Sequence, residues 1–388
     1  MEDGDPCLSG RDTITKHSTL LLFRRFSSPV KRKSDSIPHP MSLIYSPLSQ
    51  GENFIMFLTG RTSSIPRAIV SALFMLVLTT LSLAADPSAV TWEKLAPTKG
   101  LPPRASFASA YDPVSKKVVL FGGFNANAVL NETWTFNGTT WTKVKTSIAP
   151  TPRAAASMAY DHKIRKLVLF GGASGFTLFN DTWLWDGATS TWTQAHPKTV
   201  PAGASGPILF TDPANGHAIM FGGYRGQFYS RDTFRWTGTD WTLLSPSTSP
   251  YPRSAAAHAL DPVRKNVVLF GGISDNWVVQ NTWTWDGTNW TEQNPTKQPP
   301  PLYFTSGAFD PVLKEVVVFG GGSVGADQNK TWAWDGTDWT QLSPAKRPSI
   351  REGLGTVWDP ASHQFLIFGG DVFNTSKFYG DTWTLIGK

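Results

Sequence analysis

A hydrophobic run that ends in Phe-Gly-Gly occurs six times in the last three-quarters of this 388-residue chain. Successive copies are 49, 51, 49, 49 and 49 residues apart, with the first glycine at Gly122, Gly171, Gly222, Gly271, Gly320 and Gly369. A period near fifty residues indicates one supersecondary unit that is repeated until neighbouring units bury one another's faces. The repeats therefore predict a single closed array from about Thr91 to the C-terminal end.

Each repeat has the pattern of four short strands, here called A to D in chain order. The apolar run at 117–121 is β-branched, as expected of a strand buried on both faces. The segment 181–185 reads Asp-Thr-Trp-Leu-Trp, so its tryptophans alternate with period two and lie on one face of a sheet. Asp-Gly pairs such as 186–187 and 286–287 are typical of the turn that joins two antiparallel strands.

The repeat resembles the kelch motif of β-propellers. Each unit reads Pro-Arg or a variant, a run of small residues, a turn such as Asp112-Pro113, Phe-Gly-Gly, a variable loop, Asp-Thr-Trp or a variant, and a last Trp-Thr. The resemblance implies an all-β fold, a six-bladed kelch-type β-propeller with four antiparallel strands in each blade. The tryptophans are then expected to pack between blades.

The last tryptophan of each unit predicts how the ring closes. This residue recurs at Trp141, Trp192, Trp241, Trp290 and Trp339, and a further copy would fall near position 388. Trp92 lies 49 residues before Trp141 in a segment of the same pattern. We therefore expect the N-terminal strand to complete the C-terminal blade, which would remove the open edges of the array.

The first 85 residues have a different character from the repeats. Arg61 and Arg67 precede the apolar stretch Ala68–Leu83, and small residues at 84–85 follow it, as in a cleavable secretory signal. We expect residues 1–55 to be an upstream extension that is not native, 56–85 to be the signal peptide and 86–388 to be the propeller. Met56, Met41 and Met1 remain alternative starts, and an uncleaved N-terminal anchor is the alternative to export with cleavage.

Composition narrows the chemistry of the expected mature chain. The only cysteine is Cys7, so residues 86–388 have no disulfide, thiolate metal ligand or thiol nucleophile. Removing residues 1–85 takes away 9 of 35 basic and 6 of 29 acidic residues, which leaves a net charge near +3. Such a charge does not indicate a nucleic-acid partner. We expect no cofactor and no metal, and a monomer without stable membrane insertion once the signal is removed.

Topology predicts which residues can form a site. In a four-stranded antiparallel blade, the A–B and C–D turns lie on one face of the ring, and the B–C loops and D–A links lie on the other. The second face carries the irregular loops 124–131, 173–180, 224–231, 273–280, 322–329 and 371–380. Because loops on a rigid scaffold are common binding surfaces, we expect the ligand there.

Four arginines are expected at the start of strand A, beside the mouth of the central channel: Arg104, Arg153, Arg253 and Arg351. Blades three and five have Ala204 and Leu302 instead. In kelch domains that bind acidic peptides or sugar acids, arginines lie near this mouth, so the resemblance implies a ligand role for these four. The alternative is structural, with each arginine tying a D–A link to a neighbouring carbonyl or carboxylate.

The variable loops also contain aromatic residues that the repeat does not require: Phe176, Tyr224, Trp277 and Phe373. Aromatic faces near polar side chains such as Asp275 suit a sugar ring, whose C–H faces stack while its hydroxyls take hydrogen bonds. These four are further candidate ligand-binding residues, and burial over a neighbouring loop is the alternative. Two other aromatics, Phe179 and Tyr379, precede strand C and are expected to be packed.

Catalytic motifs are mostly absent. Galactose oxidase, a related propeller, needs a tyrosine crosslinked to cysteine at copper, which the expected mature chain cannot form. His258 with Asp275 or Asp371 is a weak candidate acid–base set for a sugar mutarotase or epimerase like the sialic-acid kelch enzymes. The favoured hypothesis is an exported, non-enzymatic module that binds a carbohydrate or a protein through the B–C loop face. A sugar-modifying enzyme at the same mouth is the alternative.

Overall fold

The computed structural model describes residues 90–387 except 276 and 325, and these residues form strands, turns and loops with no helix. The predicted signal peptide and the expected upstream extension lie outside the described residues. Blades one to three contain β2 (Ala108–Asp112), β3 (Lys117–Phe121), β4 (Thr133–Phe136), β5 (Trp141–Val144), β6 (Ala154–Asp161), β7 (Lys166–Ser174), β8 (Thr177–Leu178), β9 (Thr182–Asp186), β10 (Thr191–Ala195), β11 (Ile208–Thr211), β12 (Ala218–Phe221), β13 (Thr233–Trp236) and β14 (Trp241–Leu244). Blades four to six contain β15 (Ala257–Asp261), β16 (Asn266–Phe270), β17 (Thr282–Trp285), β18 (Trp290–Gln293), β19 (Ser306–Asp310), β20 (Glu315–Phe319), β21 (Gly322–Ser323), β22 (Ala326–Asp327), β23 (Thr331–Trp334), β24 (Trp339–Leu342), β25 (Gly355–Asp359), β26 (Gln364–Phe368), β27 (Thr382–Gly387) and β1 (Val90–Lys94).

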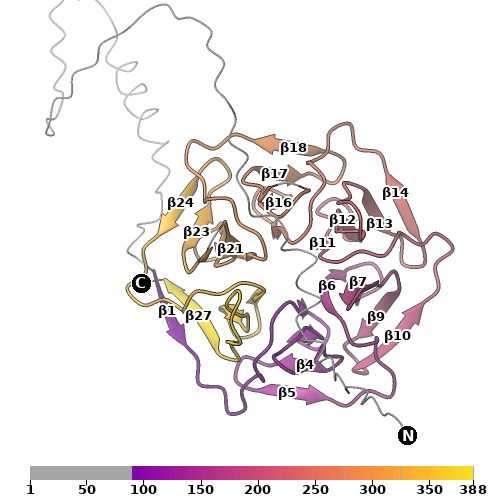
Figure 1. Ribbon diagram of the computed structural model, residues 1–388, viewed down its shortest axis with the longest axis horizontal. Coiled ribbons are helices and arrows are strands. Elements are labelled where there is room, and N and C mark those ends of the chain that lie inside the picture. The colour runs from indigo at the N-terminus through magenta and orange to yellow at the C-terminus, as the bar shows by residue number, and fades with distance from the viewer. Residues whose placement is uncertain (1–89, 276, 325, 388) are drawn as a thin grey trace, which may run out of the picture. The chain divides into compact units, whose positions relative to one another are not determined.

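The six-bladed propeller predicted from the repeat is confirmed. Six antiparallel sheets form a ring (Figure 1), and strand A of each blade packs against strand A of both neighbouring blades at its centre. The outer strands β5, β10, β14, β18 and β24 run along the perimeter, as the twist of each blade requires. Blade two gains the short strand β8, and β21 pairs with β22 above blade five.

A ring of tryptophan–threonine hydrogen bonds joins the blades near the outside. In each case the indole N–H of a strand-D tryptophan donates to the threonine that starts strand C of the preceding blade. The pairs are Trp141–Thr382, Trp192–Thr133, Trp241–Thr182, Trp290–Thr233, Trp339–Thr282 and Trp92–Thr331, at 2.8–3.2 Å. All six indoles are at most 1% exposed. The tryptophans therefore pack between blades, as the kelch resemblance implied.

A second ring of hydrogen bonds joins the blades around the channel. Near the start of strand A, one residue in each blade donates its backbone N–H to the carbonyl of the equivalent residue in the preceding blade, at 2.7–3.1 Å. These six residues all have positive φ: Ser106, Ala155, Gly206, Ala255, Phe304 and Gly353. The left-handed conformation costs an L-residue about 1–2 kcal/mol. Five of the six positions hold small residues, and Phe304 is the exception.

The strand β1 lies beside β27 at the edge of the sixth blade. The two strands pair antiparallel from Val90–Gly387 to Lys94–Trp383. Trp92 is fully buried, and its ring meets Phe319 of blade five at 5.3 Å and Phe365 at 6.1 Å. In the order of this sheet, β1 is the outermost strand and β25 the innermost.

The glycine pair after strand B is required by close backbone contacts. A Cβ on Gly122, which has φ +72°, would lie 2.6 Å from the carbonyl oxygen of Arg153 in the next blade. A Cβ on Gly123, at φ +85°, would lie 2.5 Å from the carbonyl oxygen of Ala105. The pair thus lets the D–A link, the B–C loop and strand B meet at one face of the ring.

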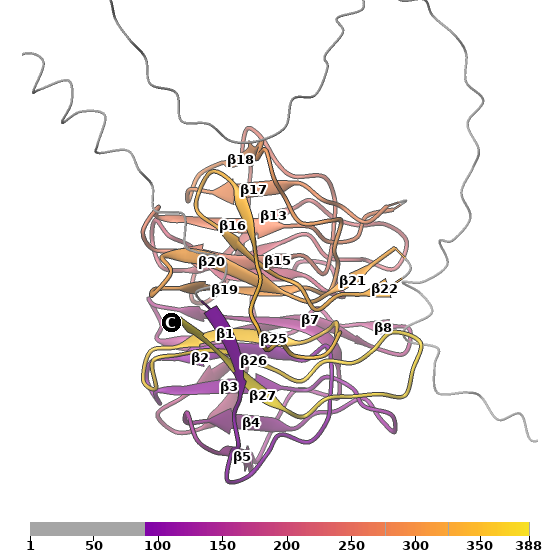
Figure 2. The same ribbon diagram turned by 90° about the vertical axis from the view of Figure 1, so that its left-hand side faces the viewer.

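The irregular loops lie together on one face. Figure 2 shows β8 and the β21–β22 hairpin, both in B–C loops, on the same side of the ring. We call this side the loop face and the side with the A–B and C–D turns the turn face. Among the described residues, no helix is long and apolar enough to span a membrane.

Candidate binding face and central channel

The four predicted arginines lie inside the blades and contact no open channel mouth. Arg104, Arg153, Arg253 and Arg351 are each at most 1% exposed. In each case Nε donates to the carbonyl two residues earlier, and Nη1 donates to the carbonyl of the first glycine in Phe-Gly-Gly, 18 residues later. The guanidinium group therefore ties the D–A link to strand B of its own blade.

Three of these arginines also bind a carboxylate at the start of strand C. Arg104 pairs with Glu132 at 2.7 Å, Arg351 pairs with Asp381 at 2.7 Å, and Arg153 makes two hydrogen bonds to Asp181. The same carboxylate accepts the indole N–H of the tryptophan two residues later, at 2.7–3.0 Å. We call each set of arginine, acid and tryptophan a clamp.

These hydrogen-bond partners lower the pKa values of the clamp carboxylates. Burial opposes ionisation of Glu132, but hydrogen bonds from Lys143, Arg104 and Trp134 lower its pKa to about 2. Burial likewise opposes ionisation of Asp181 and Asp381, yet their arginine and indole donors lower the pKa of both below the usual range. The clamps are therefore ionised at neutral pH.

The expectation that these four arginines hold a ligand stays a prediction, and the contacts of their side chains favour the structural alternative. Their hydrogen bonds are internal and their side chains are shielded, so the structural alternative describes them. A sequence signal for this role exists: an acid or amide follows each arginine by 28 or 30 residues, at Glu132, Asp181, Asn281 and Asp381. In blade five, Leu302 replaces the arginine and Lys330 occupies the acid position.

The clamp of blade four is incomplete because Asn281 stands where the other clamps have an acid. The amide oxygen of Asn281 accepts from Arg253 Nη1 at 2.8 Å, and its Nδ2 donates to Glu292 at 2.7 Å. Two buried donors, Arg253 Nη2 and Trp283 Nε1, have no hydrogen-bond partner. Burial lowers the pKa of Arg253 to about 10, with only the more distant charge of Glu292 opposing it.

The four predicted loop aromatics fall into two groups. Phe176 is 79% exposed and Trp277 is 54% exposed. Tyr224 and Phe373 are half-buried; Tyr224 donates its hydroxyl to the carbonyl of Gly226, and the backbone N–H of Phe373 donates to Asp327 at 2.6 Å. Only the first two therefore present open aromatic surface.

Phe179 and Tyr379 are packed, as expected, and the structure adds their role. The guanidinium of Arg153 lies 4.0 Å from the ring centroid of Phe179, and that of Arg351 lies 4.0 Å from Tyr379. Such cation–π contacts stabilise a desolvated guanidinium by about 2 kcal/mol or more. The two rings complete the clamps of blades two and six.

Sequence reasoning missed other exposed apolar residues of the loop face. Phe228 and Val324 lie in B–C loops and are 52% and 86% exposed, and Tyr251 lies in a D–A link at 62%. Tyr251 meets Trp277 edge-on at 6.5 Å. Among the described residues, every aromatic side chain that is more than half exposed lies on this face: Phe176, Phe228, Tyr251 and Trp277.

The turn face offers much less apolar surface. Its exposed large hydrophobic residues, within the described part of the chain, are Val263 and Val312, at 57% and 69%. Each lies in a tight A–B turn whose preceding aspartate, Asp261 or Asp310, accepts backbone N–H groups. The two faces therefore differ in both loop length and chemistry.

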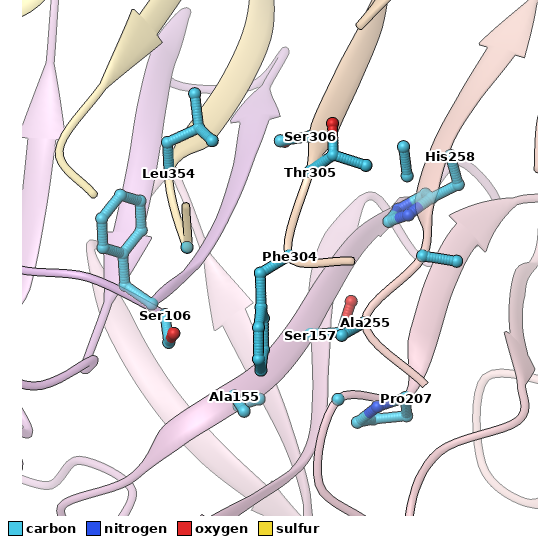
Figure 3. Close-up of a pocket in the computed structure, with 16 residues that line it drawn as sticks. Ser106, Ala155, Ser157, Pro207, Ala255, His258, Phe304, Thr305, Ser306 and Leu354 are labelled. Atoms are coloured by element: carbon cyan, nitrogen blue, oxygen red, sulfur yellow. The ribbon is translucent and has the colours of Figure 1, made fainter. Parts of the chain in front are cut away.

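The central channel contains a cavity of about 110 Å³ on the side where strand A begins. His258 points into it, with Phe304 in the middle of the channel and Ser157 nearby (Figure 3). Burial lowers the pKa of His258, although hydrogen bonds to the backbone at Ala256 and Leu209 partly oppose this. The imidazole is therefore neutral at pH 7.

The weak catalytic candidates are not assembled around this cavity. Asp275 is exposed in the loop after β16, and Asp371 is 5% exposed in a backbone bridge with Glu352. Neither aspartate, nor any other carboxylate, lines the cavity that contains His258. Across the described residues, no group of three or more histidine, cysteine, aspartate or glutamate side chains is placed to hold a metal ion.

Comparison with known proteins agrees with the repeat architecture. The sequence matches the KLHDC2/KLHL20/DRC7 Kelch-repeats domain over residues 77–272, about half of the chain. No curated protein matches the chain. The family match covers the first four Phe-Gly-Gly repeats, and the structure shows the same blade pattern continuing to β27. The chain belongs to the kelch-repeat family of β-propellers.

Proposed function

We propose that this chain is a non-enzymatic binding module whose partner is a protein that docks on the loop face. Kelch propellers typically mediate binding or protein interaction. The observation that carries the choice of face is the gathering of Phe176, Phe228, Tyr251 and Trp277, all more than half exposed, on one side of the ring. Tryptophan and tyrosine are the residues most enriched among energetically dominant interface contacts.

The clamps support this proposal because they fix the loops of blades one, two and six. The backbone N–H of Arg153 donates to Leu130 in the B–C loop of the preceding blade, while its side chain binds Gly171 and Asp181 in its own blade. A loop held at both ends loses little conformational entropy when a partner binds. The loops of these three blades therefore offer a preorganised part of the surface.

A carbohydrate is the second candidate ligand, favoured by the pair Tyr251 and Trp277. Their rings are 6.5 Å apart at 81°, both are more than half exposed, and Asp275 precedes Trp277 by two residues. An exposed ring beside a carboxylate can stack on a sugar and accept hydrogen bonds from its hydroxyls. This arrangement is confined to blade four and the link before it.

We also propose that the propeller acts outside the cytoplasm, after export. The support is the apolar stretch Ala68–Leu83, preceded by arginines and followed by small residues. Export fits a propeller whose expected mature sequence contains no cysteine. Its stability then rests on packing and the two rings of hydrogen bonds.

The experiment compares two matched sets of surface variants in the full chain. One set is Phe176→Ser, Tyr251→Ser and Trp277→Ser on the loop face, and the control is Val263→Ser with Val312→Ser on the turn face. Each tagged protein is incubated with extract from its own source, and bound proteins are quantified by mass spectrometry. The same proteins are applied to a glycan array.

We expect protein partners that bind the wild type and the control but do not bind the loop-face variant. Glycan binding with the same loss pattern, and no protein partner, would favour the carbohydrate. Partners that depend on Val263 and Val312 instead would contradict the assignment of the face. Equal melting temperatures of all three proteins establish that binding is lost without unfolding.

A further inference from the structure

The walls of the central cavity carry hydroxyl groups and apolar groups, and no charged side chain lines it. Ser106, Ser157, Thr305 and Ser306 supply hydroxyls, His258 supplies a neutral ring, and the remaining walls are glycine, alanine, proline, leucine and phenylalanine. An ion placed here would lose its hydration without gaining a charged partner, which costs several kcal/mol. The walls therefore favour an uncharged ligand with hydrogen-bonding groups.

Two of these hydroxyls keep hydrogen-bonding capacity for a ligand. Ser157 Oγ accepts the backbone N–H of Leu209 at 3.2 Å, so its own proton remains available to donate. Thr305 Oγ1 donates to the carbonyl of Phe319 at 3.1 Å, so its lone pairs remain available to accept. A ligand hydroxyl, which both donates and accepts, complements this pair of walls.

Phe304 lines the cavity at a cost in backbone energy. It occupies the left-handed ring position with φ +48°, where the equivalent residues of the other blades are serine, alanine or glycine. A bulky residue in this conformation is strained by about 1–3 kcal/mol, and such strain concentrates at ligand sites and switches. Figure 3 shows its side chain standing in the channel between Ser106 on one side and Ala255 on the other.

The volume limits the size of the ligand. The cavity measures about 110 Å³, and one water takes a share of about 30 Å³ in the liquid. The space is therefore large enough for several waters or for a small organic molecule. A three-carbon polyol fits in this space and can lay its C–H groups against the ring of Phe304.

We propose that the central channel is a binding site for one small uncharged polyol such as glycerol, with hydroxyl walls from Ser106, Ser157, Thr305 and Ser306 and with Phe304 as an apolar wall. The cavity lies at the loop-face end of the channel, and none of the exposed docking aromatics lines it. The site does not depend on the identity of the docking partner.

Calorimetry with three probes of nearly equal size tests the proposal: glycerol, its cationic amine analogue serinol and its anionic acid analogue glycerate. Glycerol is expected to bind once per chain with a dissociation constant on the order of a millimolar or below. Serinol and glycerate are expected to bind at least tenfold more weakly, because the cavity offers no counter-charge. Equal binding of all three would overturn the proposal.

Variants locate the site. Ser306→Ala and Ser106→Ala are expected to weaken glycerol binding at least threefold each, and the control Ser174→Ala, outside the cavity, is expected to leave it unchanged. Phe304→Ala should weaken glycerol and admit the four-carbon polyol erythritol. A crystal structure with glycerol that shows ordered water only, or an adventitious additive bound elsewhere, would overturn the proposal, as would glycerol affinity that is unaffected by both serine variants.

Discussion

Completing the clamp of blade four should stabilise the propeller. Asn281→Asp supplies the carboxylate oxygen that Arg253 Nη2 and Trp283 Nε1 lack. A buried donor left without a partner costs about 1–3 kcal/mol, and hydrogen bonds to charged groups contribute about 1.5–3 kcal/mol. The new carboxylate must itself be partly desolvated, since the equivalent side chains Glu132, Asp181 and Asp381 are only 15–26% exposed.

The neighbour of Asn281 decides the size of the gain. Glu292 now accepts from the amide of Asn281 at 2.7 Å, and a carboxylate at 281 would repel it. In blade one, Lys143 occupies the corresponding position and pairs with Glu132. The single variant is therefore expected to gain about 1 kcal/mol, and Asn281→Asp with Glu292→Lys about 2–3 kcal/mol.

Urea unfolding at pH 7 measures these differences, and thermal melting supports them. A gain of about 2 kcal/mol corresponds to roughly 4 °C in a domain of this size. Asp181→Asn in blade two is the matched opposite change, because it removes the acid from a complete clamp, and it should cost a similar amount. A double variant that is no more stable than the wild type, beside a destabilised Asp181→Asn, would refute the clamp reasoning.

Three further predictions address other parts of the chain. Deleting Thr91–Leu95 removes most of β1 together with Trp92, whose buried indole alone contributes at most roughly 4–6 kcal/mol. The truncated protein should therefore melt at a lower temperature and aggregate, whereas trimming residues 86–89 should change little. Equal melting temperatures of the two truncated proteins would refute the N-terminal seam. Burial, with Asp335 and Asp310 nearby and Arg264 opposing, raises the pKa of Glu315 to about 7. The folded protein therefore holds this proton more tightly than the unfolded chain, and the associated stability is full below about pH 4.5 and lost as pH rises to 7. The stability of Glu315→Gln relative to wild type should therefore be higher at pH 7.5 than at pH 5, and an identical difference at both pH values would contradict this. Mass spectrometry of the exported protein should find an N-terminus near Ala85 or Asp86, and peptides from residues 1–55 in cells would rule out a start at Met56.

The sequence predicts the blades well because the same structural signals recur in each repeat. Phe-Gly-Gly, the Asp-Gly turn and the strand-D tryptophan each have one structural solution, and six copies at near-constant spacing identify it. The role of Trp92 as a partner of blade five follows from the same spacing. These features are local or strictly periodic, so they can be read without coordinates.

The site was harder to predict, because it depends on distances between residues far apart in the chain. Arg153 and Asp181 are separated by 28 residues, and nothing in the local pattern of Arg153 shows that its charge is already satisfied. The left-handed conformation of Phe304 also has no local signal, since phenylalanine rarely adopts it. Exposed aromatic residues such as Tyr251 lie in D–A links whose sequence varies from repeat to repeat, so the repeat pattern does not predict them.

A photo-crosslinker placed on each face tests the central claim, that the loop face is the docking surface. The full chain would carry p-benzoylphenylalanine at Phe176 or Trp277 on the loop face, and at Val263 or Val312 on the turn face. These four side chains are all more than half exposed, so each can reach a bound protein. Covalent adducts with a partner protein are predicted from positions 176 and 277 and not from 263 and 312; adducts that form from the turn-face positions and not from the loop face would contradict the account.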